Sequence, residues 1–283
     1  MKQKVWFITG ASKGFGLEIA KAALANGDKV VATVRKSREK FEASFKETDD
    51  ILIVQLDVTK EREVKNGIEK AIFRFGRIDV LVNNAGYGLL GATEEASDEE
   101  VKRQFDTNVF GLLNVTRSVL PHMRSQRSGH IINISSLFAY IASVPGLGIY
   151  SSTKFAVEGI SEGLALEVKS LGIHVTAVAP GLFSTNFASP DSYQSSKLIF
   201  EDYKETVGKV REGLKQLDGN QPGDPAKLAQ VIIQLADSEH PPLHLPIGKD
   251  AVLAFRAKTD MMHKDVSVWE NISVSTDRQT AVS

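Results

Sequence analysis

Seven short apolar runs alternate along the chain with longer stretches that repeat at a helical period. The runs lie at about 5–9, 29–34, 51–56, 78–82, 130–135, 174–179 and 243–247. Most are apolar at successive positions rather than at every second one, which is typical of strands covered on both faces. Apolar residues at three- and four-residue spacings predict helices at about 14–26, 60–75, 98–126, 150–171 and 224–238.

The order of these elements predicts the architecture. A strand, a crossover helix and a parallel strand form a right-handed unit, and a series of such units builds an open sheet with helices on both faces. We therefore expect an α/β fold, a single Rossmann-type doubly wound domain with a seven-stranded parallel sheet over residues 1–250. No linker rich in proline, glycine and serine divides this span.

Composition narrows the classes of function. The 283 residues are 42% hydrophobic and 24% charged, as in ordinary globular proteins. With 34 basic and 35 acidic side chains the net charge is −1, which disfavours nucleic acid as a partner. The first apolar run is too short for a membrane span or a signal peptide, and we expect a cytoplasmic protein. The chain has no cysteine, and its six histidines show no metal-binding pattern, so no metal site is expected.

A glycine-rich turn, Thr9-Gly10-Ala11-Ser12-Lys13-Gly14-Phe15-Gly16, joins the first predicted strand to the first predicted helix. Missing side chains let the backbone approach a phosphate, and the amide groups at a helix start carry partial positive charge toward it. Such a turn can also be a plain structural corner. Its place in a βαβ series favours dinucleotide binding, with contacts from Gly10, Ser12, Lys13, Gly14, Phe15 and Gly16.

Two further motifs follow in order. Asn83-Asn84-Ala85-Gly86 follows the fourth predicted strand, and Tyr150-Ser151-Ser152-Thr153-Lys154 opens a predicted helix. Together with Thr-Gly-x-x-x-Gly-x-Gly, they resemble the signature set of the short-chain dehydrogenases/reductases, with matching order and spacing over residues 4–250. The resemblance implies an oxidoreductase that transfers hydride between a nicotinamide cofactor and a carbonyl or alcohol group.

Tyr150 and Lys154 lie four residues apart and therefore share one face of the predicted helix. A phenol has an ordinary pKa of about 10. A nearby ammonium favours the phenolate and lowers that pKa, which makes the phenol usable as an acid or base near neutral pH. An arbitrary Tyr-x-x-x-Lys is more often a half-buried tyrosine beside a solvated lysine. The other motifs favour the catalytic interpretation here.

A serine and an asparagine complete the predicted catalytic group. The strand at 130–135 leads to Ser136, at the sheet edge where ligands bind. The resemblance implies that Ser136 orients the substrate oxygen, and that Asn108 perturbs the long fourth helix so that a water connects to Lys154. Ser136 lies fourteen residues before Tyr150, where the family more often has thirteen, and we infer one inserted residue around 142–145. A serine that only caps the following turn is the alternative.

The end of the second predicted strand bears on the choice of cofactor. An NAD enzyme places a carboxylate there for the ribose hydroxyl, whereas the 2′-phosphate of NADP favours cations. Val34 occupies that position, Arg35 follows it, and Lys13 precedes the second glycine of the turn. These features predict NADP(H). Alternatively, Arg35 and Lys36 are ordinary charged side chains exposed to solvent after a strand. That interpretation does not explain why no carboxylate stands at the end of this strand.

By resemblance, further residues at the strand ends hold the adenine, the adenosine and the nicotinamide amide. They are, in that order, Asp57 and Val58, then Asn83, Asn84, Ala85 and Gly86, then Pro180, Gly181 and Thr185. A strand that ends in Pro-Gly is also a common turn signal.

Substrate information is expected in a predicted lid over about 183–218. Five aromatic residues lie there: Phe183, Phe187, Tyr193, Phe200 and Tyr203. Such rings can cover a bulky apolar ketone or alcohol of the steroid, retinoid or aryl ketone kind. They can equally anchor short helices to the core.

Residues 251–283 extend past the usual end of the family. Val252, Phe255, Met262, Val266 and Trp269 recur at three- and four-residue spacings, which predicts an amphipathic helix before a polar tail. We expect its apolar stripe to pack on the rest of the chain. Alternatively, it blocks a subunit contact of a homodimer or homotetramer, or covers the substrate mouth.

Three functions compete. The first is an NADP(H)-dependent carbonyl reductase or alcohol dehydrogenase acting on a small-molecule ketone or alcohol. The second is a non-catalytic NADP-binding sensor with the same fold, against which the intact Ser136, Tyr150 and Lys154 argue. The third is a lyase or epimerase of the longer, sugar-nucleotide-processing branch, whose glycine spacing and larger C-terminal part this chain lacks.

Overall fold

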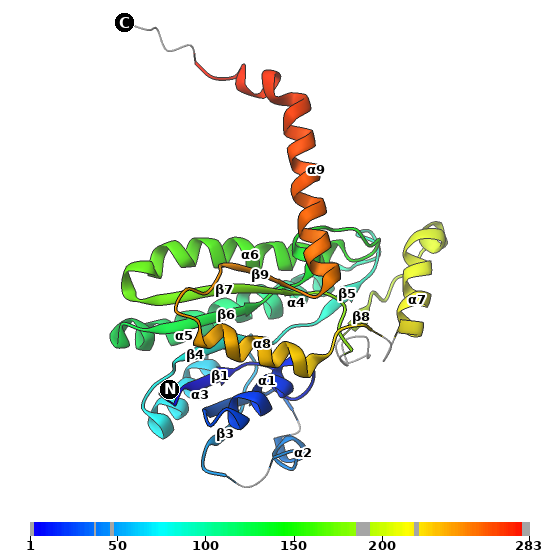
Figure 1. Ribbon diagram of the computed structural model, residues 1–283. Coiled ribbons are helices and arrows are strands. Elements are labelled where there is room, and N and C mark those ends of the chain that lie inside the picture. Colours follow the sequence, from blue (N-terminus) through cyan, green and yellow to red (C-terminus); the bar gives the residue numbers. More distant parts are fainter. Residues whose placement is uncertain (1–2, 37, 46–47, 185–192, 218–220, 279–283) are drawn as a thin grey trace, which may run out of the picture.

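Seven parallel strands form the main sheet in the computed structural model, which describes residues 3–36, 38–45, 48–184, 193–217 and 221–278. In chain order they are β1 (Val5–Ile8), β2 (Lys29–Val34), β3 (Ile51–Gln55), β4 (Val80–Asn83), β6 (Gly129–Ile134), β7 (Ile173–Pro180) and β9 (His244–Ile247). Their order across the sheet is β3-β2-β1-β4-β6-β7-β9, and each of these pairings is parallel. The predicted Rossmann-type sheet is confirmed (Figure 1).

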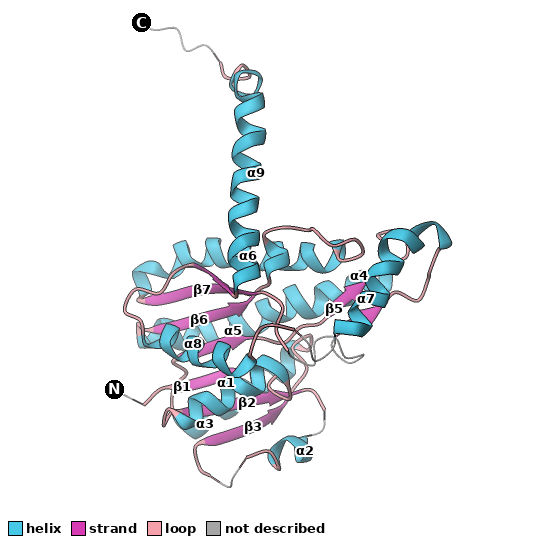
Figure 2. Ribbon diagram, turned by 45° about the vertical axis from the view of Figure 1, so that its right-hand side comes forward, coloured by secondary structure: helices cyan, strands magenta, loops and turns pink. Residues whose placement is uncertain are grey.

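Helices cover both faces of this sheet (Figure 2). Successive strand residues point to opposite faces, and Trp6 and Ile8 therefore pack on one side while Phe7 packs on the other. The first side carries α1 (Gly14–Ala25) and α8 (Pro225–Asp237). The second side carries α3 (Glu61–Phe75), α5 (Gly111–Gln126) and α6 (Gly148–Val168).

The remaining elements are short, apart from one long C-terminal helix. A small second sheet pairs β5 (Gly88–Leu90) with β8 (Tyr193–Ser195). The short helices are α2 (Arg38–Glu42), α4 (Asp98–Phe105), α7 (Lys209–Leu217) and the single turns Leu137–Ala139, Lys169–Leu171, Glu201–Tyr203 and Lys204–Gly208. No helix within the described ranges is long and apolar enough to cross a membrane.

The predicted helix at 98–126 is interrupted. It begins as α4 with a capping box, in which the Ser97 hydroxyl and the Glu100 carboxylate each bind the other residue's backbone amide. One π-helical turn, Asp106–Phe110, then joins α4 to α5. Such turns insert an extra residue and often occur at functional sites. The buried residues of this one include Asn108.

The last helix, α9 (Lys249–Val274), contradicts one expectation. Its beginning is fixed to the body, because Ala251 is fully buried and the ring of Phe255 packs edge-on against Tyr140 with 4.9 Å between centroids. The helix then projects away from the sheet (Figure 1), and every residue at 259–274 is exposed. The prediction that the apolar stripe packs on the rest of the chain is therefore wrong for the outer part of the helix.

The core assignment can be tested at Leu81, which is fully buried in β4. We expect Leu81→Ala to lower the free energy of unfolding by about 2–5 kcal/mol, because it removes apolar contacts and leaves a cavity. Urea denaturation followed by circular dichroism measures the change. Leu166→Ala is the matched control, since Leu166 is 80% exposed on α6. Equal losses in the two variants would contradict the assignment.

Candidate active site

A cavity of about 530 Å³ lies at the carboxyl edge of the sheet. Its walls include segments that follow β1, β2, β3, β4, β6 and β7. The chain winds outward in opposite directions from β1 and β4, which are neighbours in the sheet. Open α/β sheets bind their ligands at such a reversal of strand order.

The cavity brings together most residues that the sequence singled out. They are Gly10, Ser12, Lys13, Gly14, Phe15, Arg35, Asp57, Val58, Ala85, Gly86, Ser136, Tyr150, Lys154, Pro180 and Gly181. Gly16, Asn83 and Asn108 do not line it. Thr185 lies outside the described residues. Within the described part of the chain, no three histidine, aspartate or glutamate side chains are grouped to hold a metal ion.

The glycine turn packs closely against the loop after β4. Gly10 and Gly14 have φ angles of 64° and 57°, in the left-handed region that favours glycine. A Cβ on Gly10 would lie 2.9 Å from the Cα of Ala85, and a Cβ on Gly16 would lie 2.6 Å from the carbonyl oxygen of Gly10. Gly16 therefore permits the tight turn, although it does not line the cavity.

Thr9 and Asn84 hold this contact, and the sequence analysis did not predict the hydrogen bonds between them. The Thr9 hydroxyl accepts hydrogen bonds from the backbone amides of Asn84 and Ala85 at 2.9 and 3.0 Å. The side-chain amide of Asn84 donates to the carbonyl oxygens of Thr9 and Gly10 at 2.9 and 3.0 Å. Thr9 belongs to the glycine-turn motif and Asn84 to the Asn-Asn-Ala-Gly motif, and this was the signal in the sequence that could have pointed to them.

Asn83, which the resemblance had placed on the adenosine side, does not line the cavity. Its side-chain amide donates to the hydroxyl of Thr116 and to the side-chain oxygen of Asn133, both at 2.9 Å. These groups lie inside the fold, and Asn83 is 5% exposed. Asn84, rather than Asn83, lines the cavity.

The predicted acid–base pair lies on the buried face of α6. Tyr150 and Lys154 are 5% and 7% exposed, and Lys154 Nζ lies 5.8 Å from the centre of the Tyr150 ring. The Lys154 ammonium donates to the carbonyl oxygen of Ile134 at 2.8 Å, which fixes it at the end of β6. Ser136 forms a hydrogen bond with Tyr150. The inferred insertion between Ser136 and Tyr150 therefore does not separate their side chains.

Burial sets the ionisation of this pair. It raises the pKa of Tyr150 to about 12, and the hydrogen bond with Ser136 opposes the rise. It lowers the pKa of Lys154 to about 8, and the negative charge of Glu158 opposes the fall. At neutral pH the phenol is protonated and the lysine is largely cationic. The folded chain therefore places a protonated phenol beside a positive charge.

Glu158 extends this row of ionisable groups along α6. Residues 150, 154 and 158 are four apart and share one face of the helix. Glu158 is 6% exposed, and one of its carboxylate oxygens lies 2.8 Å from Nδ1 of His244 on β9. The sequence analysis did not single out Glu158, although its spacing from Lys154 was visible. Its charge supports the cationic form of Lys154.

Asn108 lies in the π turn and bonds to two other segments. Its side chain accepts from the amide of Tyr87 at 3.1 Å and donates to the Tyr87 carbonyl oxygen at 3.0 Å. It also donates to the hydroxyl of Thr153 at 3.1 Å. Asn108 thus ties the loop after β4 to α6 beside Lys154. The water connection from Asn108 to Lys154 stays a prediction.

The cavity wall beyond Tyr150 is mainly apolar. It consists of aromatic and aliphatic side chains from the segment before α6, from β8 and from α7: Phe138, Val144, Leu147, Tyr193, Val210 and Leu214. Two amides, Gln194 and Gln221, add polar groups to the same cavity. A chamber of this kind accepts an apolar body and orients it with few polar contacts.

The aromatic residues of the predicted lid divide between the two expected roles. Phe183 and Tyr193 line the cavity. Phe200 and Tyr203 do not line it, and Tyr203 packs in the apolar cluster around α7. Phe187 lies outside the described residues. Tyr193 both lines the cavity and packs in that cluster, so lining the cavity and anchoring the segment are not exclusive.

A buried ion pair fixes α7. Glu95 is fully buried, and its carboxylate accepts from Arg211 at 2.5 Å and from the amides of Ala92 and Phe200 at 2.8 and 2.9 Å. Burial by itself raises the pKa of Glu95, but these donors outweigh it and hold the pKa below its usual value. The carboxylate thus stays ionised and anchors the helix that supplies part of the apolar wall. Sequence reasoning did not identify this pair.

The lowered pKa of Lys154 has a consequence for stability. Between pH 8 and 10.5 the unfolded chain holds a proton on this lysine that the folded chain has lost, so the free energy of unfolding rises with pH there, by at most about 3 kcal/mol. We expect Lys154→Met to remove this rise. Urea denaturation at several pH values up to about 9.5, below the ordinary titration of tyrosine, measures it.

The control for that experiment is Lys227→Met, which removes the same charge from an exposed position of α8. It is expected to keep the pH dependence of the unaltered protein. An unchanged slope in Lys154→Met would show that the lysine does not lose its proton early in the folded chain.

Comparison with known proteins identifies the family. The profile described as short chain dehydrogenase matches residues 4–195. A 3-ketodihydrosphingosine reductase from Bacteroides thetaiotaomicron is 38% identical over 248 residues, which cover 88% of this chain and 89% of that protein.

Solved structures agree with this match. A short-chain dehydrogenase from Streptomyces avermitilis has a TM-score of 0.89 and 41% identity, covering 98% of this chain and 100% of that one. Two other solved relatives, with 28% and 30% identity and TM-scores of 0.73 and 0.69, hold NADH and NADP respectively. With its motifs, its sheet and these relatives, the chain belongs to the short-chain dehydrogenase family of oxidoreductases.

Proposed function

We propose that this protein is an NADP(H)-dependent oxidoreductase that transfers hydride between the cofactor and a bulky, apolar ketone or secondary alcohol. The observation that carries the proposal is one cavity that joins a glycine turn to the buried group of Ser136, Tyr150 and Lys154. The first part suits a dinucleotide, and the second suits proton transfer at a carbonyl or alcohol oxygen.

The glycine turn fits the pyrophosphate of a dinucleotide. Gly10 and Gly14 line the cavity beside the first turn of α1. The residues at the start of α1, Lys13, Gly14 and Phe15, line the cavity, so the partial positive charge of the helix start faces it. Bound there, the nicotinamide cofactor supplies or accepts the hydride.

Charge favours NADP(H) over NAD(H). Arg35 and Lys13 both line the cofactor half of the cavity, where a 2′-phosphate would meet two cations. Val34, at the position of the usual carboxylate, is buried and apolar. Because relatives with either cofactor exist, this part of the proposal rests on the residues of this chain.

Tyr150 is the acid–base group of the proposed reaction. In reduction, its protonated phenol donates to the substrate oxygen, and the Ser136 hydroxyl adds a second hydrogen bond to that oxygen. In oxidation, the phenolate accepts the proton, and the cationic Lys154 stabilises the phenolate. Burial raises the pKa of Tyr150, contrary to the lowering expected from the sequence, so the phenol holds its proton at neutral pH until the substrate oxygen takes it.

The apolar wall supports the substrate class. Phe138, Leu147 and Leu214 face the same cavity as Tyr150. A polar metabolite would lose its water there without gaining partners, whereas an apolar ketone would gain contact area. The relation to a 3-ketodihydrosphingosine reductase also supports a ketone as substrate.

A variant at Tyr150 tests the chemistry. A panel of apolar ketones, followed by the loss of NADPH absorbance, first identifies a substrate. We expect Tyr150→Phe to reduce kcat at least about 100-fold, because the ring remains but the transferable proton is gone. Tyr203→Phe, outside the cavity, is the control and keeps its activity. Equal rates for Tyr150→Phe and the unaltered protein would leave a non-catalytic NADP-binding role.

A second variant tests the cofactor choice. We expect NADPH to bind more tightly than NADH, and Arg35→Asp to weaken NADPH binding by about 10- to 100-fold, because a charged hydrogen bond is replaced by repulsion. Titration calorimetry with both cofactors measures this. Arg62→Asp, exposed on α3, is the matched control. Tighter binding of NADH by the unaltered protein would refute the preference.

A further inference from the structure

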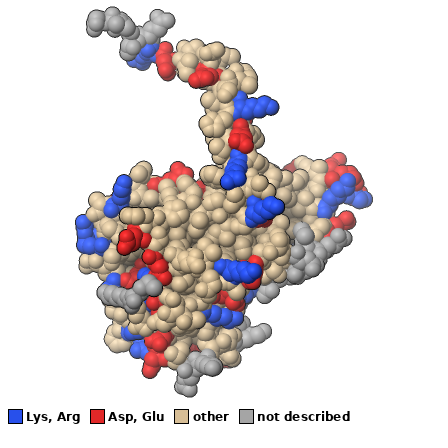
Figure 3. All heavy atoms as spheres, in the orientation of Figure 1, with Lys and Arg blue, Asp and Glu red and all other residues tan. Residues whose placement is uncertain are grey.

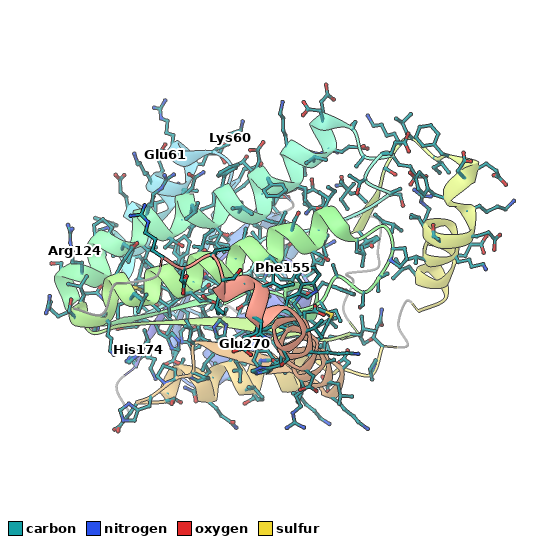
Figure 4. All side chains as sticks on the ribbon, turned by 90° about the horizontal axis from the view of Figure 1, so that it is seen from above. Lys60, Glu61, Arg124, Phe155, His174 and Glu270 are labelled. Carbon is teal, nitrogen blue, oxygen red and sulfur yellow. The ribbon has the colours of Figure 1, made fainter. Side chains whose placement is uncertain are left out.

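The outer part of α9 is covered by no described part of the chain. Figures 1 and 2 show the helix rising from the body, and Figure 4, which looks down on the molecule, shows it nearly end-on with Glu270 on it. Lys258 is the last partly buried residue, and every residue at 259–278 is exposed. An isolated helix of about this length is only marginally stable in water. Packing against a partner would therefore stabilise this segment.

One seam along the helix is suited to another helix. Residues 252, 255, 259, 262, 266, 269 and 273 recur at alternating spacings of three and four, the repeat by which paired helices face each other. Five of these seven are apolar, namely Val252, Phe255, Met262, Val266 and Trp269. Met262, Val266 and Trp269 are 54%, 61% and 59% exposed. Large apolar side chains gathered in this way mark an interaction surface.

The seam matches itself in the antiparallel direction. When two copies of α9 cross at Met262, Phe255 of each lies at the level of Trp269 of the other, and Thr259 lies at the level of Val266. Each of these levels then contains at least one apolar side chain. Phe255 of one copy and Trp269 of the other lie at the same level at each end of the contact. A surface that is complementary to itself about a two-fold axis is the requirement for a closed dimer.

The charges that flank the seam match in the same register. Arg256 and Glu270 flank one side, and Lys258 and Asp265 flank the other (Figure 3 shows blue and red side chains along the projecting helix). Antiparallel crossing at Met262 places Arg256 opposite Glu270 and Lys258 opposite Asp265, and symmetry repeats both pairs. Parallel pairing would place Asp265 near Glu270, which is repulsive. Charge therefore favours a second copy in the antiparallel direction.

We propose that a second copy of this chain covers the seam, through antiparallel pairing of the two α9 helices about a two-fold axis at Met262. The pairing brings Trp269 of the partner subunit to Phe255. The ring of Phe255 packs on Tyr140, which lies four residues after Ser136. The dimer contact thus extends to the segment between Ser136 and α6.

A charge exchange in the full chain tests the register. Lys258 and Asp265 have no charged residue three or four positions away in the helix, so changing them alters no pair within α9. Lys258→Asp and Asp265→Lys each place like charges at both symmetric contacts. Each is expected to raise the dimer dissociation constant at least about ten-fold in analytical ultracentrifugation. The double variant restores opposite charges and returns the constant to within about three-fold.

The control is Lys264→Asp, which makes the same charge change on the outward side of α9 and leaves the dissociation constant unchanged. Trp269→Glu places a charge in the seam and gives a monomer. Tryptophan emission supplies a second readout, because Trp6 is fully buried and Trp269 is 59% exposed. The emission is expected to shift to shorter wavelength as the protein concentration rises through dimerisation.

Three results would overturn this dimer. One is an unaltered protein that stays monomeric at tens of micromolar. Another is a dimer that none of Lys258→Asp, Asp265→Lys or Trp269→Glu weakens, since a different face would then make it. The third is a double exchange that fails to recover association while circular dichroism shows α9 intact. None of these results bears on the proposed catalytic function, which is read from Tyr150→Phe.

Discussion

The contact between the carboxyl ends of β1 and β4 determines where the rest of the site lies. Thr9 and Asn84 join these two strand ends through four hydrogen bonds. Gly10 makes the contact possible, because a side chain there would meet Ala85 at 2.9 Å. The contact sits where the strand order reverses, and the cavity joins the glycine turn there to the group of Ser136 and Tyr150. A bulkier turn would displace both parts of the cavity.

The acid–base pair depends on the same sheet edge through a different restraint. Lys154 is carried by α6, but its ammonium is fixed by a carbonyl oxygen at the end of β6. Tyr150, one helical turn earlier, is held by Ser136, which also follows β6. Burial acts on both groups in the same sense, since it favours the neutral form of each. Glu158 limits this effect at Lys154 and thereby preserves the positive charge beside the phenol.

Much of this arrangement is visible in the sequence, and the failures have physical reasons. The seven strands were predictable because central strands such as β1 and β4 are buried on both faces and read as continuous apolar runs. Asn83 and Asn84 were not distinguishable, because neighbouring residues at a strand end point in opposite directions and a motif does not show which one lines the cavity. Glu95 and Arg211 are 116 residues apart, so no local pattern connects them. Periodicity revealed the apolar stripe of α9, but it did not show that the described chain leaves the outer part of this stripe exposed.

In α7, the residue that anchors the helix is different from the residues that line the cavity. Arg211 ties the helix to Glu95 in the interior, while its neighbours Val210 and Leu214 face the cavity. Substitutions at the facing positions can change the size and shape of the chamber without disturbing the ion pair that holds it in place. A change in the molecules that the chamber accepts therefore needs no change in the carboxylate or the guanidinium that holds α7 in place.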